Sequence, residues 1–279
     1  MALIDLLLNL AGLILWHAWR GSKMESPTGS ALTLASNLRP AGVQRPRRWL
    51  HLVSLVALLF LRPVFYWHLG SALDWSAAWS PGLVNLLFRS DFLARMVQFS
   101  FLSFAWTLFL WHAWMCCLSA VNPRKDTNLV TLGVREQLGW LAYVPGPILM
   151  FIPFVVLGLV WYFSAPLFTH IGVLPAARSH QQLVQQSLLI GASLIFSFRW
   201  LLGAIFLLRF LNTYVFLGSH PFWEFVQRTG RMLLWPLNWM RVAHLDFAPI
   251  AGLVLVWWIS IEGERFLRKL FFALPIAWP

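Results

Sequence analysis

The sequence contains little charge and almost no cysteine, and both shortages limit what the protein can be. Only 11% of its 279 residues are charged, and only 10 are acidic, whereas an ordinary soluble domain carries roughly 25% charged residues. So few acids leave few candidates for general acid–base catalysis. The two cysteines, Cys116 and Cys117, are adjacent inside an apolar run, which fits neither a zinc site nor a disulfide framework.

Catalytic signatures are also missing from the sequence. It contains no G-x-S-x-G, H-E-x-x-H, Walker A or Rossmann glycine pattern, so we expect neither an enzyme nor a bound cofactor. The net charge of +11 could suggest a nucleic-acid partner. However, the Lys and Arg residues are scattered in short loops rather than gathered in a basic domain, which is typical of membrane orientation. We therefore expect no nucleic-acid binding.

Apolar and aromatic residues dominate the composition. They make up a hydrophobic share of 59%, with 18 Trp and 23 Phe, and the mean hydropathy is +0.68. Because runs of about 20 apolar residues can cross a bilayer, we expect an all-α, polytopic membrane protein with about six transmembrane helices. The expected spans are Leu3–Trp19, Trp49–Gly70 or Ser71–Arg89, Phe92–Leu118, Ile148–Phe168, Leu188–Leu217 and Phe247–Ile261.

The basic residues predict the orientation. Twelve of them fall in the segments Arg20–Arg48, Arg124–Arg135 and Arg228–Arg241, against five on the opposite side of the predicted spans. The side richer in Lys and Arg is normally cytoplasmic. We therefore expect a multi-pass protein of a bacterial-type inner membrane, with its amphipathic segments on the cytoplasmic face.

An internal repeat organises the chain. The stretch "LMFIPFVVLGLVWYF" (Leu149–Phe163) aligns with "LDFAPIAGLVLVWWI" (Leu245–Ile259) at seven identical positions of fifteen. Upstream, "LFLWHAWMCCLSAVNP" (Leu108–Pro123) aligns without gaps with "FLLRFLNTYVFLGSHP" (Phe206–Pro221). The pattern predicts two or three units of span, amphipathic segment and span. The expected parts are a degenerate N-terminal repeat, 1–100, with a polar linker over 20–48, and repeats over 101–170 and 183–270.

The last repeat resembles the YggT family of bacterial integral membrane proteins. Its members carry motifs like "LLLRIW…NPF" and "DPLLRPIRRxxPxxxxxDxSP", and residues 207–250 follow that order. Arg209 falls on the family arginine, Pro236 on the central proline, and Asp246 and Pro249 on the Asp-x-Ser-Pro. The chain departs from the pattern in two places: Arg241 alone remains of the basic pair, and Ala248 replaces the serine.

The resemblance implies a divergent, enlarged member without a known reaction. Relatives are associated with cell division, nucleoid or thylakoid organisation, osmotic tolerance and maturation of a cytochrome complex. This range implies a scaffold or assembly factor whose partners are other membrane proteins.

Two arginines interrupt the apolar run Leu188–Leu217, and a charge at bilayer depth is costly. Arg209 could extend to the interface or pair with Asp246, whose position before Pro249 is also typical of a helix start. Arg199 lies nearer the middle of the run and has no obvious acidic partner in the other spans. An anionic lipid, a partner protein or a group of backbone carbonyls could bind it.

A second set of residues combines basic and aromatic side chains between Pro221 and His244. Such a segment is typical of a helix lying among lipid headgroups, so we expect contact with anionic lipids or a partner protein. The residues are Arg228, Arg231, Arg241, Trp223, Trp235 and Trp239.

The motif "LWHAW" occurs at Leu15–Trp19 and at Leu110–Trp114. Its histidines, His17 and His112, could ligate a haem. Both copies border polar loops, however, which favours an aromatic belt at the membrane interface. The sequence therefore yields three hypotheses. The first is a non-enzymatic scaffold or assembly factor. The second is a transporter of an anion or osmolyte using Arg199 and Arg209, and the third is a haem-holding subunit of a redox complex.

Overall fold

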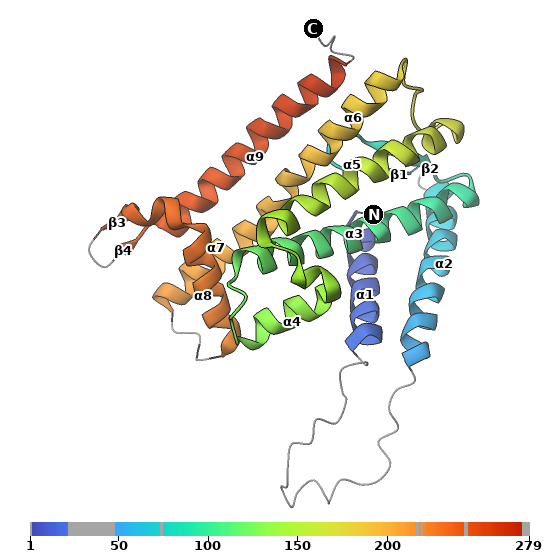
Figure 1. The fold of residues 1–279 in the computed structure, drawn as a ribbon. Helices are drawn as coiled ribbons and strands as arrows, with labels where there is room; N and C mark the ends of the chain where they lie inside the picture. The colour runs from blue at the N-terminus through green and yellow to red at the C-terminus, as the bar shows by residue number, and fades with distance from the viewer. Residues whose placement is uncertain are drawn as a thin grey trace, which may run out of the picture. The chain divides into compact units, whose positions relative to one another are not determined.

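The structure is a computed structural model, and it describes residues 2–21, 48–72, 75–215, 218, 220–242 and 245–274. It is 81% helical, as expected for an all-α membrane protein (Figure 1). Within the described residues, five helical stretches are long and apolar enough to cross a membrane. They are α1 (Ala2–Gly21), α2 (Arg48–Ala72), α3 (Leu93–Val121), α5 (Gly146–His170) and the stretch that joins α6 (His180–Ser193) through η3 (Leu194–Ser197) to α7 (Phe198–Tyr214). Most of the predicted linker, 22–47, lies outside the described residues.

The sixth predicted span corresponds to α9 (Ala248–Phe272), which is not among these five. Its apolar stretch ends at Ile261, after which Glu262, Glu264 and Arg265 belong to the same helix. An 18-residue window within α9 therefore contains more charge than a typical span. Helix length and composition therefore support five transmembrane helices within the described residues, one fewer than the six expected.

Two short pairs of strands, of which the second is antiparallel, depart from the all-α prediction. One consists of β1 (Ser76–Trp79) and β2 (Leu86–Arg89). The other consists of β3 (Arg241–Val242) and β4 (Leu245–Asp246), with Arg241 opposite Asp246. The first pair also decides between the alternatives for the second crossing, because 49–70 is helical whereas 76–89 contains strands.

Each of the two amphipathic segments is divided into an α-helix and a 3₁₀ helix. Residues 122–143 of the first repeat form a loop at 122–128, then α4 (Leu129–Leu138), then the 3₁₀ helix η2 (Gly139–Tyr143). Gly139 has a φ of 59°, a left-handed conformation that glycine adopts most readily and that ends the helix. In the second repeat α8 (Pro221–Leu233) precedes η4 (Trp235–Met240), and Pro236 lies in η4.

The described residues form two compact units, one over 1–79 and 87–108, and the other over 80–86 and 109–279. In the first unit, α1 packs against α2, and the first part of α3 completes the core with Phe104 against Leu55 and Leu59.

In the second unit, α5 packs along α6 and α7 packs along α9. Glycine permits the first of these contacts, because a Cβ on Gly191 would lie 2.7 Å from the Phe154 carbonyl oxygen. The core below them is built from α3, α4, α5, α7, α8 and α9 and includes Leu149, Phe206, Phe225, Leu234 and Ala248.

Candidate functional site

A buried polar network joins the three helices of the first unit. Its centre is Arg62 of α2, which forms an ion pair with Asp5 of α1. The Arg62 guanidinium also donates to Asn9 Oδ1 at 2.7 Å, to Ser103 Oγ at 3.1 Å and to the Tyr66 hydroxyl at 3.0 Å. Tyr66 in turn donates to Asp5 at 3.0 Å. The network therefore gives the buried charge several hydrogen-bond partners, as a charge inside a membrane protein requires.

Helical spacing places these side chains together. Asp5 and Asn9 are four residues apart on α1, and Arg62 and Tyr66 are four apart on α2, so each pair shares one helix face. Ser103 of α3 closes the network by donating to Asp5 Oδ2 at 3.0 Å. The sequence analysis did not single out Arg62 and missed this site. The two i,i+4 polar pairs in apolar helices were the signal available.

The second unit contains the predicted partner of Arg209. Its Nη2 lies 3.0 Å from Asp246 Oδ2, and the Arg209 side chain is only 2% exposed. The structure therefore shows the pairing alternative rather than a side chain that extends to the interface. Asp246 also accepts the backbone N–H of Ala248 at 3.2 Å. The N-cap position of α9 is Phe247, one residue later than predicted, while Pro249 lies in the first turn as expected and is buried.

Arg199 has an acidic partner that the sequence analysis did not find. Its Nη1 donates to Glu264 of α9 at 3.1 Å, and the two side chains are 24% and 28% exposed. The expectation that Arg199 has no acidic partner was wrong, because Glu264 follows the last predicted span, Phe247–Ile261, rather than lying within one. The α6–α7 stretch of 35 residues is about 52 Å long, much longer than a core of about 30 Å. The middle of this stretch therefore need not be the middle of the membrane.

Polar contacts between the loop 122–128 and α8 form a third feature of the second unit. We call the loop 122–128, α4 and α8 together the platform. Arg228 of α8 lies 2.5 Å from Asp126, and Asn122 donates to Thr229 Oγ1 at 3.1 Å. Asn128 caps α4 by accepting the N–H of Val130 and donates to the Pro221 carbonyl oxygen at 2.9 Å. These contacts fix the two amphipathic helices to each other.

The electrostatics of Asp126 make the platform sensitive to acid. Burial raises the pKa of this carboxyl group. Hydrogen bonds from Thr131 and the Asn128 backbone, together with the nearby Arg228 charge, lower the pKa by more than burial raises it, so that it lies below its ordinary value of 3.8. A depressed pKa means that the carboxylate stabilises the folded state above the unfolded pKa and ceases to do so as pH falls through the folded pKa.

We therefore expect the thermal stability of the wild-type protein to exceed that of Asp126→Asn by a constant margin above about pH 5. The margin should shrink as the pH is lowered below 3.8, because protonated Asp126 resembles asparagine. Thermal unfolding in detergent between pH 3 and pH 7 measures it. Asp91→Asn, in the exposed pair with Arg89, is the control. A margin that stays constant down to pH 3 would contradict the role of the carboxylate.

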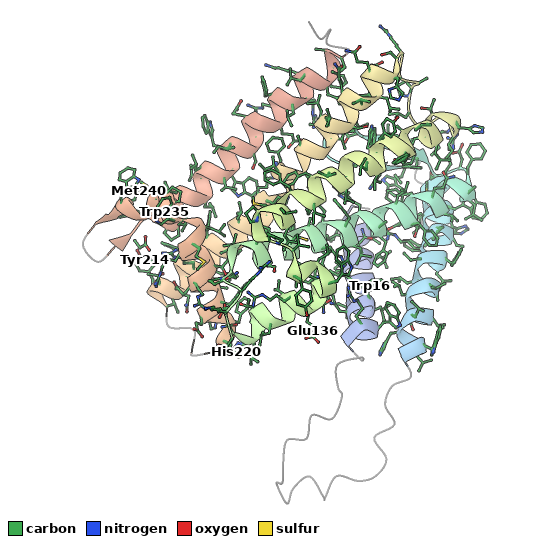
Figure 2. The ribbon with its side chains drawn as sticks, in the orientation of Figure 1. Trp16, Glu136, Tyr214, His220, Trp235 and Met240 are labelled. Carbon is green, nitrogen blue, oxygen red and sulfur yellow. The ribbon has the colours of Figure 1, made fainter. Side chains whose placement is uncertain are left out.

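Some of the residues predicted to contact lipid or a partner are exposed in the structure, and others contact residues of the chain itself. Trp235 and Trp239 of η4 are exposed, and Figure 2 shows Trp235 beside the strands β3 and β4. Arg231 is exposed on α8, and Trp223 is half-buried against Phe222, with ring centroids 5.1 Å apart. Arg228 instead pairs with Asp126. The side chain of Arg241 lies outside the described part of the chain.

The two histidines of the LWHAW motif lie in α1 and α3. Trp16 and Trp19 share a helix face as predicted, and their ring centroids are 5.1 Å apart. Within the described residues, no group of three or more His, Cys, Asp or Glu side chains could hold a metal ion. Haem ligation by His17 and His112 stays a prediction, and a Soret band in the purified protein would support it.

These sites consist of ion pairs and hydrogen-bond networks between membrane helices, together with a fixed amphipathic platform. Comparison with known proteins does not assign a function to these sites, because no protein-family model, curated protein or solved structure matches the chain.

Proposed function

We propose that this protein is a non-enzymatic scaffold or assembly factor for a membrane protein complex, and a divergent relative of the YggT family. The platform carries the proposal. Two amphipathic helices that are far apart in the sequence are held together by Asp126–Arg228, Asn122–Thr229 and Asn128–Pro221 contacts. Polar contacts of this kind fix the relative position of two helices more precisely than apolar packing alone, and a fixed surface is what a docking partner requires.

The order of elements supports two repeats of one unit. The end of α3 is followed by α4, η2 and α5, and α7 is followed by α8, η4 and α9. In both cases an amphipathic helix and a 3₁₀ segment separate two apolar helices. We assign the platform to the cytoplasmic face, because Arg124, Lys125, Arg135, Arg228 and Arg231 belong to it or adjoin it.

We include α9 as a sixth crossing. Asp246 and Glu264 are 18 residues apart, or about 27 Å along a helix, close to the thickness of a hydrocarbon core. Each of these carboxylates pairs with an arginine of α7, Asp246 with Arg209 and Glu264 with Arg199. The two ion pairs therefore lie toward opposite ends of the α7–α9 contact, where charges can approach the headgroups.

The same pairs weigh against transport of an anion by Arg199 and Arg209. An arginine that binds a transported anion needs its positive charge uncompensated in the empty site. Asp246 lies 3.0 Å from Arg209 and Glu264 lies 3.1 Å from Arg199, so neither arginine by itself has an uncompensated charge for a transported anion.

The scaffold proposal predicts protein contacts at the platform. A photo-crosslinking amino acid at Leu129 or Leu132, which are exposed on α4, should yield adducts with another protein after irradiation of the native membrane. The same amino acid at Val254, exposed on α9, is the matched control and should yield mainly lipid adducts. The platform adducts should decrease in an Asp126→Asn background, because this change loosens α8 from α4.

Gel analysis and mass spectrometry of the adducts distinguish the outcomes. Discrete protein adducts from Leu129 and Leu132 but not from Val254 are expected. If neither platform position yields a protein adduct in the native membrane, or if all three positions yield the same adducts, the proposal fails.

A further inference from the structure

An apolar groove lies in the second unit between α5, α6 and the C-terminal part of α9. Its volume is about 810 Å³, and its walls include Phe151, Phe154, Leu159, Ile195, Phe266 and Leu267. This volume falls in the range of sites that bind a small molecule. Gly158 and Gly191 form part of the wall, and their missing side chains let α5 and α6 approach closely and keep that wall smooth.

A surplus of positive charge adjoins the groove. Glu264 accepts from Arg199 through one carboxylate oxygen, at 3.1 Å, and from Arg268 through the other, at 2.9 Å. Two guanidinium groups thus share one carboxylate, which leaves one net positive charge. Residues next to this cluster also line the groove: Phe196 of η3 lies one turn before Arg199, and Gly263 of α9 lies beside Glu264.

The environment of Arg199 suits a ligand at the membrane interface. Its guanidinium lies 5.7 Å from the Trp200 ring centroid and 5.8 Å from that of Trp257, and tryptophan is enriched at headgroup level. Within the described residues Arg199 donates one hydrogen bond, from Nη1, and its side chain is 24% exposed. Donors therefore remain for an oxygen atom from outside the chain.

From these observations we infer that this region binds one anionic phospholipid. Its phosphate would contact Arg199 and Arg268, where the net positive charge complements it, and one acyl chain would fill the groove. Neither part suffices alone. The hydroxyl groups of the groove lining, on Tyr162 and Ser187, already form hydrogen bonds within the chain, and the shared carboxylate makes the cluster too weakly charged to hold free phosphate in water. This inference involves different residues from the platform, and it can fail or succeed independently of the scaffold proposal.

The test is binding of phosphatidylglycerol, with phosphatidylcholine as the zwitterionic comparison. Native mass spectrometry of the full chain in detergent should show one phosphatidylglycerol molecule retained in preference to phosphatidylcholine. Arg268→Gln removes the net charge and should weaken phosphatidylglycerol binding about fivefold, as expected for one basic residue near an anionic headgroup. Arg95→Gln on α3 removes the same charge elsewhere and should leave binding unchanged.

A second variant tests the groove without altering charge. Ala192 lies on its wall and is exposed, so Ala192→Trp should fill part of the groove and reduce retention of both lipids. Val254→Trp, on an exposed position of α9 outside the groove lining, is the size-matched control. Thermal unfolding of each variant without added lipid confirms that it is folded.

Three outcomes would overturn the inference. The first is equal retention of the two lipids by the wild-type protein. The second is unchanged phosphatidylglycerol binding in both Arg268→Gln and Ala192→Trp. The third is stabilisation by inorganic phosphate alone as large as that by phosphatidylglycerol, which would show that the cluster binds an anion without using the groove.

Discussion

Replacing Arg62 by leucine should lower the free energy of unfolding by about 3–5 kcal/mol, the cost of removing one partner of a buried ion pair. The change leaves Asp5 without its counter-charge, and it removes the donor that bonds Asn9 and Ser103. Because water cannot replace this donor within a membrane helix bundle, the orphaned acceptors make up most of the cost. Thermal unfolding in detergent measures the loss as a lowered Tm.

The chain offers a matched control in the same unit. Arg89 and Asp91 also form an ion pair, at 2.7 Å, but both side chains are well exposed, so Arg89→Leu should cost about 0–1 kcal/mol. The double variant Arg62→Leu with Asp5→Asn should be more stable than Arg62→Leu alone, because no unpaired carboxylate remains. If Arg62→Leu is no more damaging than Arg89→Leu, the network does not hold α1, α2 and α3 together.

The apolar parts of the fold were predictable because they depend on sequence-local properties. Five of the six expected spans correspond to helices that could cross a membrane, since runs of apolar residues and turn residues suffice to mark them. The Arg209–Asp246 pair was among the alternatives because Asp246 lies at the start of the span that follows the one carrying Arg209. The short strands β3 and β4, of two residues each, carry no pattern by which a sequence could reveal them.

The polar network of the first unit could not be predicted in the same way. Arg62 and Asp5 are separated by 57 residues, and their meeting depends on the rotation of α1 against α2. The pairs Asp5/Asn9 and Arg62/Tyr66 mark a polar face on each helix, but the sequence does not indicate which helix that face meets. Glu264 was missed for a related reason: its place after the apolar run suggested a tail in water, whereas α9 continues to Phe272 and carries it to Arg199.

The second large effect is expected at the other fully buried arginine. Arg209→Leu should also cost about 3–5 kcal/mol, because Asp246 would lose the guanidinium 3.0 Å from its carboxylate. The packing around Arg209 is close as well. A Cβ on Gly230 of α8 would lie 2.7 Å from Arg209 Cδ, so α8 is built to accommodate the arginine side chain and leucine would leave part of that space empty. Arg231→Leu, one residue further along α8 and exposed, should change the stability by no more than about 0.5 kcal/mol.

Two further variants separate the charge from the packing. Asp246→Asn keeps an acceptor for the Ala248 N–H and therefore the start of α9, while it removes the negative charge. Combined with Arg209→Leu, it should recover part of the lost stability if the uncompensated carboxylate causes the loss. If the double variant unfolds at the same temperature as Arg209→Leu, the cost comes from the packing of Arg209 against α8. The ion pair would then not be what holds α7 to the start of α9, and a structural role for this arginine would rest on its shape rather than on its charge.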